Sequence, residues 1–146
     1  MQVDPRGPRF AALVTTVVLV AVLVTGSWAL LAAQAVVFAL ATFLGLRYAP
    51  YGLVFKVLVR PRLAPPGELE DAAPPRFAQG VGLVFALVGT AGYATGTTWL
   101  GIGATALALA AAFLNAVFGF CLGCEMYLLI RRFTAKKDRS ERKVPA

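Results

Sequence analysis

Two long stretches without any charged residue dominate the hydrophobic pattern of this chain. They span residues 10–46, a run of 37, and residues 77–124, a run of 48. A helix that crosses a bilayer needs about 20 predominantly apolar residues, so each stretch is long enough for two such helices. Short polar segments, TGSW at 25–28 and ATGTTW at 94–99, mark a turn inside each stretch. The pattern predicts an all-α integral membrane protein with four transmembrane helices.

One alternative concerns the first apolar segment, where AQA at 33–35 imitates the cleavage site of a secretory signal peptide. The apolar run continues unchanged past this point, and the segment has a counterpart later in the chain. We therefore interpret it as a membrane span rather than as a cleaved signal.

The two halves of the chain read as an internal repeat. Pro-Arg-Phe occurs at 8–10 and again at 75–77, an offset of 67. After the short turns the offset becomes 71, which aligns APYGLVFKVLVR at 49–60 with FCLGCEMYLLIR at 120–131. Each half predicts a helical hairpin followed by a short interfacial helix. Because each unit crosses the membrane twice, the two hairpins have the same orientation and form a parallel pseudo-repeat.

We interpret residues 1–146 as a single membrane domain. The first repeat half comprises residues 7–62 and the second comprises residues 74–133. A proline-rich acidic linker at 63–73 joins them, and a basic tail at 134–146 follows. A linker of this composition is expected to be exposed.

The basic residues indicate the orientation in the membrane. None of the 14 Lys and Arg residues lies in either short turn; they precede the first span, separate the second from the third, and follow the fourth. Cytoplasmic loops carry the excess of positive charge. We predict a multi-pass protein of the plasma membrane with both termini and the central loop in the cytoplasm. Topology and attraction to anionic lipid then account for the net charge of +7, and no nucleic-acid partner is expected.

Composition excludes several classes of function. Apolar residues make up 59% of the chain and charged residues 14%, against about 25% charged residues in soluble domains. The chain has no histidine and two cysteines, so a four-ligand zinc site would need a second subunit or carboxylates, and no metal is predicted. No nucleotide-binding glycine motif occurs, and no cofactor is predicted. An electron acceptor would therefore be a quinone or a protein.

The two cysteines form a C-x-x-C motif where the second apolar stretch gives way to charge. Cys121 aligns with Pro50, and proline is favoured at the first position of a helix. The alignment predicts a helix that begins at Cys121 after a break near Gly119. Both sulfurs of Cys121 and Cys124 would then share one helix face within disulfide reach, at a helix N-terminus that stabilises thiolates. The alternative is a fourth helix that runs unbroken to Arg132.

Free cysteine often serves only as a small buried residue. Here, however, the pair holds every cysteine of the chain and lies beside an acid at the predicted membrane border. We predict Cys121, Cys124 and Glu125 as candidate catalytic residues, with Cys121 as the attacking thiolate and Cys124 as the resolving thiol. Glu125 would disfavour the neighbouring thiolate or move its proton; alternatively, it lies at the headgroup level.

Three further polar residues, Lys56, Gln34 and Asn115, can be explained by structural roles, and Lys56 can also be explained by a role at the dithiol. Lys56, aligned with Tyr127, is either an interfacial anchor or faces the dithiol across the pseudo-twofold axis and stabilises a thiolate. Gln34 and Asn115 are the clearest hydrogen-bonding side chains within the spans. Such groups usually pair between helices.

The order of these motifs also carries a resemblance. Val-Asp-Pro-Arg near the start, Pro-Arg-Phe before each hairpin and FCLGCEMY at 120–127 resemble the small bacterial membrane family known as domain of unknown function 4395 (DUF4395). The family has no established activity, and its members are often encoded beside thioredoxin-like proteins and thiosulfate sulfurtransferases. The resemblance implies a partner of one of these kinds, and a role in thiol or sulfane-sulfur traffic for the stretch that holds Cys121, Gly123, Cys124 and Glu125.

Two functions of different classes follow. The first is exchange of electrons or sulfane sulfur between the cytoplasmic-side dithiol and a soluble partner, in a thiol-disulfide oxidoreductase or a sulfur-relay component. The second is a non-enzymatic membrane anchor or small transporter subunit with structural cysteines, whose basic tail holds a partner. Replacement of Cys121 by Ser separates them, because it abolishes thiol exchange and leaves an anchor's binding intact.

Overall fold

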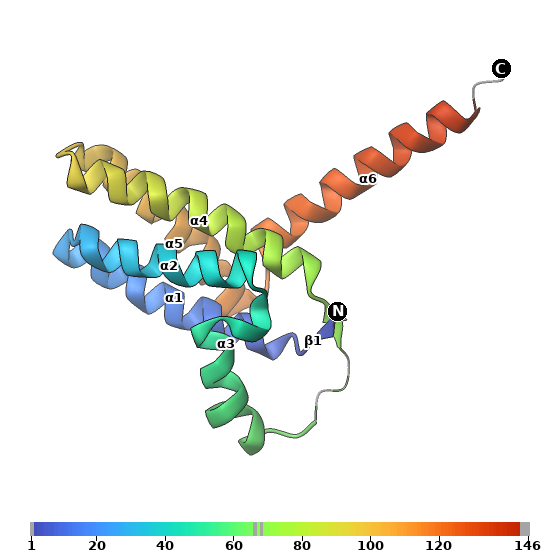
Figure 1. Ribbon diagram of the computed structural model, residues 1–146, viewed down its shortest axis with the longest axis horizontal. Coiled ribbons are helices and arrows are strands. Elements are labelled where there is room, and N and C mark those ends of the chain that lie inside the picture. Colours follow the sequence, from blue (N-terminus) through green and yellow to red (C-terminus); the bar gives the residue numbers. More distant parts are fainter. Residues whose placement is uncertain (1, 66, 68, 144–146) are drawn as a thin grey trace.

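The computed structural model describes residues 2–65, 67 and 69–143 and consists almost wholly of helices. In chain order the elements are β1 (Gln2–Val3), α1 (Arg6–Thr25), α2 (Trp28–Phe43), η1 (Leu46–Tyr48), α3 (Pro50–Val54), the π-helix η2 (Phe55–Val59), η3 (Arg60–Arg62), β2 (Glu70–Asp71), α4 (Ala73–Ala94), α5 (Thr98–Phe118) and α6 (Leu122–Lys143). Helices α1, α2, α4 and α5 form a bundle, and α6 extends away from it (Figure 1).

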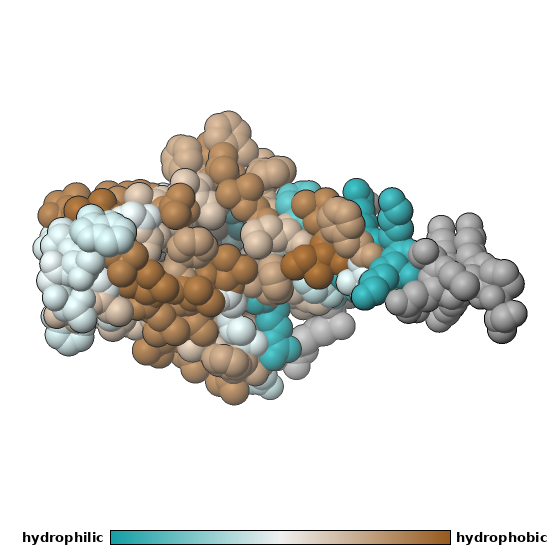
Figure 2. Space-filling model, turned by 90° about the horizontal axis from the view of Figure 1, so that it is seen from above, coloured by the Kyte–Doolittle hydropathy of each residue, from teal (hydrophilic) through white to brown (hydrophobic). Residues whose placement is uncertain are grey.

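Three helices of the bundle are long and apolar enough to cross a membrane. They are α1, α4 and α5, with 20, 22 and 21 residues; α2 is also apolar but has 16. Their large side chains point outward in many places: Val24 is 80% exposed, Phe43 71% and Leu107 62%. Figure 2 shows apolar residues over much of one face of the bundle. Exposure of so much apolar surface is unfavourable in water and favourable in lipid, so this is a membrane protein.

The core lies where helices of the first hairpin meet helices of the second. Helix α1 packs mainly on α5, and α2 packs mainly on α4. The buried cluster contains Leu19, Val22, Leu31, Ala35, Phe38 and Ala86. Small residues allow the close approach: a Cβ atom added to Gly89 of α4 would lie 2.7 Å from a side-chain methyl carbon of Leu31 of α2.

Both hairpin turns lie at the same end of the bundle (Figure 1). Gly26 ends α1 in the left-handed conformation, with φ of 64°. Ser27 then caps α2, because its hydroxyl oxygen accepts a hydrogen bond of 3.2 Å from the N–H of Leu30. Residues 95–97 separate α4 from α5. The turns therefore fall where the two short polar segments predict them.

The segments that follow α2 and α5 differ from each other in length. After α2 the chain forms short helices between residues 46 and 62, in agreement with the prediction. After α5 the prediction of a short interfacial helix is wrong: α6 has 22 residues and continues through the basic segment as far as Lys143. No glycine or proline occurs between Gly123 and Lys143, so nothing in the sequence ends the helix. Residues 144–146 of the predicted tail lie outside the described residues.

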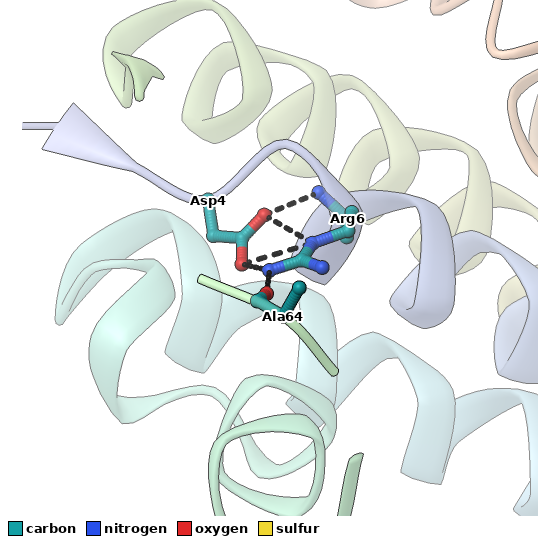
Figure 3. A network of polar contacts seen from close by, with 3 residues as sticks. All are labelled: Asp4, Arg6 and Ala64. Atoms are coloured by element: carbon teal, nitrogen blue, oxygen red, sulfur yellow. Dashed lines mark hydrogen bonds and ion pairs between the residues drawn. The ribbon is translucent and has the colours of Figure 1, made fainter. Parts of the chain in front are cut away.

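The proline-rich linker is tied to the N-terminal segment, which the prediction of an ordinary exposed linker did not include. Strand β1 pairs antiparallel with β2 at the end of the linker. The Asp4 carboxylate accepts hydrogen bonds from Nε and Nη2 of Arg6 at 3.1 and 2.9 Å, and the same Nη2 donates to the carbonyl oxygen of Ala64 at 3.0 Å (Figure 3). The Val-Asp-Pro-Arg motif thus fastens the linker to the start of α1. Linker residues 66 and 68 lie outside the described residues.

Candidate functional site

The cysteine pair lies at a break between α5 and α6. Helix α5 ends at Phe118, and Gly119 follows with φ of 68°, a conformation that glycine adopts without strain. Helix α6 then begins at Leu122. The predicted break near Gly119 is confirmed, and the alternative of an unbroken fourth helix is wrong.

Cys121 occupies the N-cap position of α6. The N–H of Cys124 donates to the Cys121 sulfur at 3.2 Å, and the N–H of Glu125 donates to the Cys121 carbonyl oxygen at 3.0 Å. A side chain at the N-cap normally accepts a hydrogen bond from the third helical residue, and here the sulfur is that acceptor. The two half-buried cysteines are joined as a disulfide, with Cα atoms 5.2 Å apart. The same sulfur therefore caps the helix and forms the bridge.

Gly123, between the two cysteines, brings α6 into contact with α4. A Cβ atom at this position would lie 2.5 Å from Cβ and 2.6 Å from Cα of Ala78, so only glycine fits. One turn further, the ring of Tyr127 packs against Phe77 with centroids 5.7 Å apart, and the Arg131 guanidinium lies 5.9 Å from the Tyr127 ring centroid. The first turns of α6 are thereby fixed on α4.

An arginine from the first helix caps the end of α5. The Arg9 Nη2 atom donates to the carbonyl oxygens of Ala116 and Val117, each at 3.4 Å. These carbonyls lack partners within their own helix and carry partial negative charge. A cation thus lies beside the segment that leads to Cys121.

Arg76 caps the end of α2 in the same way. Its Nε and Nη2 atoms donate to the carbonyl oxygens of Thr42 and Phe43 at the end of α2, at 2.6 and 3.0 Å. Sequence reasoning treated Arg9 and Arg76 only as part of the basic charge on one membrane face and missed this capping role. The signal was present, because Arg9 and Arg76 are the arginines of the two Pro-Arg-Phe motifs.

Glu125 is exposed in the first turn of α6, where the helix dipole favours a negative charge. Its carboxylate forms no ion pair within the described part of the chain. The three predicted site residues thus belong to one helix start, and Glu125 offers an accessible acid next to Cys124. Among the residues that the structure describes, no three Cys, Asp or Glu side chains come together as metal ligands.

A cavity of about 280 Å³ extends from the disulfide into the bundle. Cys121 contributes to its wall and Cys124 does not. Most of the wall is apolar and comes from α1, α4, α5 and α6. Three polar side chains interrupt it, namely Thr15, Gln79 and Asn115. Sequence reasoning singled out Asn115 as a partner for another helix and did not identify Thr15 or Gln79.

The structure does not bring Lys56 to the dithiol. Lys56 lines a second cavity, of about 340 Å³, together with Asp4 and Arg60. That cavity lies beside α1 and the segment after α2, whereas Cys121 lies after α5. The exposed Lys56 side chain suits an interfacial anchor.

Gln34 forms the inter-helix hydrogen bond that its position in a span predicts. It is 1% exposed, and its Oε1 accepts a hydrogen bond of 2.6 Å from the hydroxyl of Tyr51. The bond ties α3 to α2 and places the short helices close to the bundle.

Comparison with known proteins identifies a family for this chain. No curated protein and no solved structure matches the chain. A family model described as a domain of unknown function (DUF4395) matches residues 3–132, which include the Val-Asp-Pro-Arg motif, all four bundle helices and the cysteine pair. The match covers far more than half of the sequence, and the chain therefore belongs to the DUF4395 family.

Proposed function

We propose that this protein exchanges electrons or sulfane sulfur between its Cys121–Cys124 pair and a soluble thioredoxin-like protein or thiosulfate sulfurtransferase. The observation that carries the proposal is the position of Cys121, which is half-buried at the start of α6 with its sulfur accepting the Cys124 N–H. An amide donor and the positive end of a helix dipole both stabilise a thiolate relative to a thiol. The thiolate is the form that attacks sulfur.

Electron exchange proceeds through a mixed disulfide. The Cys121 thiolate attacks one sulfur of the partner's disulfide, and the partner's other sulfur leaves as a thiolate. The Cys124 thiolate then attacks the Cys121 sulfur, which closes the internal disulfide and releases the partner as a dithiol. Two electrons pass to the partner, and the reaction runs in reverse when the partner arrives reduced. Glu125 accepts the proton that Cys124 loses.

Sulfur exchange uses the same nucleophile without net oxidation. The Cys121 thiolate attacks the terminal sulfur of a persulfide on the partner. The bond between the partner's two sulfurs breaks, and the partner leaves as a thiolate. The product on this chain is a Cys121 persulfide, and this transfer is redox-neutral. In a second step the Cys124 thiolate attacks the Cys121 sulfur, the bond to the outer sulfur breaks and sulfide leaves. This second step forms the Cys121–Cys124 disulfide, so the dithiol is oxidised while the transferred sulfur is reduced.

In the proposed arrangement the chain crosses the membrane four times, as two hairpins related by a pseudo-twofold axis. Reciprocal capping supports the repeat, because Arg9 and Arg76 occupy matching positions and each caps the second helix of the other hairpin. The two cavities support it as well, since five wall residues of the cavity beside Lys56 match wall residues of the cavity beside Cys121 at offsets of 67 or 71. The pairs are Ala11 with Ala78, Gln79 with Ala12, Ala41 with Ala112, Gly52 with Gly123, and Phe55 with Met126.

The proposed orientation places the cysteine pair on the cytoplasmic side. The basic residues flank the ends of the bundle opposite the hairpin turns, and the excess of Lys and Arg marks the cytoplasmic face. The cytosol holds thiols reduced, so a soluble dithiol partner would be available there.

A second candidate function, that of a membrane anchor, is favoured by α6. Beyond its contact with α4 the helix leaves the bundle (Figure 1) and exposes Leu129 (50%), Ile130 (52%) and Phe133 (70%) beside several cations. A basic amphipathic helix of this kind can hold a partner or anionic lipid. In this function the cysteines would serve only to cap and pack the helix.

A trapping experiment separates the two functions. We would express Cys124→Ser, which cannot resolve a mixed disulfide, and recover disulfide-linked partners after acid quenching. Thiol exchange predicts a reductant-sensitive adduct with Cys124→Ser and no adduct with Cys121→Ser.

The matched measurement is the redox state of the wild-type pair in cells, read from maleimide gel shifts after an oxidant or thiosulfate pulse. A pair that stays reduced through the pulse, with no adduct in Cys124→Ser, would contradict exchange. Partner retention that survives Cys121→Ser would then identify the protein as an anchor.

A further inference from the structure

The cavity beside the disulfide has the volume of a site for a small ring. Small residues of α4 and α5, including Gly82, Ala108 and Ala111, leave a space of about 280 Å³ among larger apolar neighbours such as Phe85. A dry cavity of about 150 Å³ already holds benzene, so this volume admits a substituted six-membered ring. Its position among the bundle helices gives access to compounds that dissolve in lipid.

Thr15 offers an unused hydroxyl to this cavity. It lies within α1, is 5% exposed and forms part of the wall. Threonines within apolar helices normally donate to the carbonyl oxygen four residues earlier. Six threonines of the described chain do so, namely Thr16, Thr25, Thr42, Thr90, Thr95 and Thr134. Thr15 forms no hydrogen bond with any described residue.

Two amide side chains share the same wall. Gln79 from α4 and Asn115 from α5 both line the cavity, and neither side chain is hydrogen-bonded to another described residue. Thr15 is buried, whereas the Gln79 and Asn115 side chains are partly exposed. A buried hydroxyl without a protein partner costs free energy, and a ligand that reaches Thr15 in this cavity would also meet the two amides. Hydroxyl and amide groups supply donors, and the complementary ligand carries acceptor oxygens on an apolar frame.

Cys121 gives the cavity a redox group. Cys121 lines the cavity and Cys124 does not, so Cys121 is the member of the pair that a ligand in the cavity would contact. An apolar ring with carbonyl acceptors that can also take two electrons from a dithiol is a quinone. A lipid acyl chain would satisfy the apolar wall and leave the three polar groups unpaired.

We infer that the cavity lined by Cys121, Thr15, Gln79 and Asn115 binds a lipid-soluble quinone, which oxidises the Cys121–Cys124 dithiol. This inference rests on the proposed thiol exchange, run in the direction in which a soluble dithiol reduces the internal disulfide. Two S–H bonds break and the S–S bond re-forms. Two electrons and two protons pass to the quinone, whose two carbonyls become the hydroxyls of the quinol. The net reaction carries electrons from a soluble dithiol to the membrane quinone pool.

The test uses the full-length protein in quinone-free lipid nanodiscs under anaerobic conditions. The pair is reduced, freed of reductant and mixed with a fully ring-substituted benzoquinone bearing a decyl chain, which thiols cannot alkylate. Quinone absorbance and free thiols are followed together. We expect one quinol per disulfide formed in wild type.

Two matched pairs of variants assign the reaction to the cavity. Ala111→Leu fills the space, whereas Ala110→Leu adds the same volume on the exposed face of α5. We expect oxidation by quinone to slow about tenfold or more in the first and to be unchanged in the second. Thr15→Val should slow it about threefold to tenfold through loss of one hydrogen bond, while Thr16→Val, whose hydroxyl bonds Ala12, should not.

Reduction of the disulfide by a soluble dithiol is measured on every variant and should be the same in all four. If wild type is reduced by the dithiol but not oxidised by the quinone, the quinone inference is overturned and thiol exchange stands. Equal quinone oxidation in Ala111→Leu and Ala110→Leu also overturns it. A pair that reacts with neither reagent overturns the proposed function itself.

Discussion

Replacement of Gly123 by Ala tests how the cysteine stretch is held. The added methyl group would lie 2.5 Å from Cβ and 2.6 Å from Cα of Ala78, where carbon atoms prefer separations of about 3.5–4.0 Å. Helix α6 must therefore move away from α4 by about 1 Å or more at this point. Overpacking of this kind costs about 1–3 kcal/mol.

This cost falls on one local contact, because α6 packs mainly on α4. The population in which the first turn of α6 is open should rise by the corresponding factor, about 5- to 150-fold. Hydrogen exchange reads this directly, since the amides of Cys124 and Glu125 are held by Cys121. We expect faster exchange in the peptide covering residues 118–132, together with a lower free energy of unfolding.

Gly103→Ala is the matched control, because no atom lies within 4 Å of a Cβ at that position. In a helix this change should be neutral or stabilising by up to about 1 kcal/mol. Adding Ala78→Gly to Gly123→Ala removes the nearest clashing atom and should restore part of the protection. Wild-type exchange rates in Gly123→Ala would refute the contact between α6 and α4 and, with it, the placement of the cysteines.

Two further predictions concern polar contacts. Tyr51→Phe leaves Oε1 of the buried Gln34 without its donor, and Nε2 of that side chain already has no partner. We therefore expect the free energy of unfolding, measured by heat or denaturant, to fall by about 1–3 kcal/mol. The control is Tyr48→Phe, whose ring is 57% exposed and whose replacement should leave the stability unchanged. The Arg6 side-chain hydrogen bond lowers the pKa of Asp4, so its stabilising effect is complete above the ordinary Asp pKa and is lost as pH falls through the depressed value. An acid-active protease should accordingly cut the 63–73 linker faster on acidification, and Asp4→Asn should remove that pH dependence.

The apolar pattern alone predicted the helical class and the positions of both hairpin turns. Charge-free length identifies membrane helices because each buried charge is costly in lipid. The same reasoning could not predict how far α6 extends, since residues after Arg132 are polar and their helix depends on local propensity rather than on burial. Nor could it predict that the linker is tied down, because the Asp4–Arg6–Ala64 contact joins segments nearly sixty residues apart through one side chain.

The part of the candidate site that depends on neighbouring residues in the sequence, the helix start at the cysteine pair, was predictable. The alignment of Cys121 with Pro50 correctly indicated a helix start, although Cys121 is the N-cap of α6 and Pro50 is the first residue of α3. The cavity was beyond sequence reasoning. Its polar wall joins Thr15 to Asn115, one hundred positions away, and the packing of α1 on α5 brings these two residues together.

In the proposed repeat, the two cavities differ in the residue that stands at matching positions beside them. Both halves place a glycine in the first turn of a helix that follows the hairpin, and both positions are tight: a Cβ at Gly52 would lie 2.6 Å from the carbonyl oxygen of Leu46. In the first half the neighbouring position is Pro50, which can only shape the backbone. In the second half it is Cys121, at the mouth of a cavity with three unpaired polar side chains. The proposed thiol exchange accounts for this difference, because it needs a cysteine at this position in one half, whereas a purely structural repeat does not account for it.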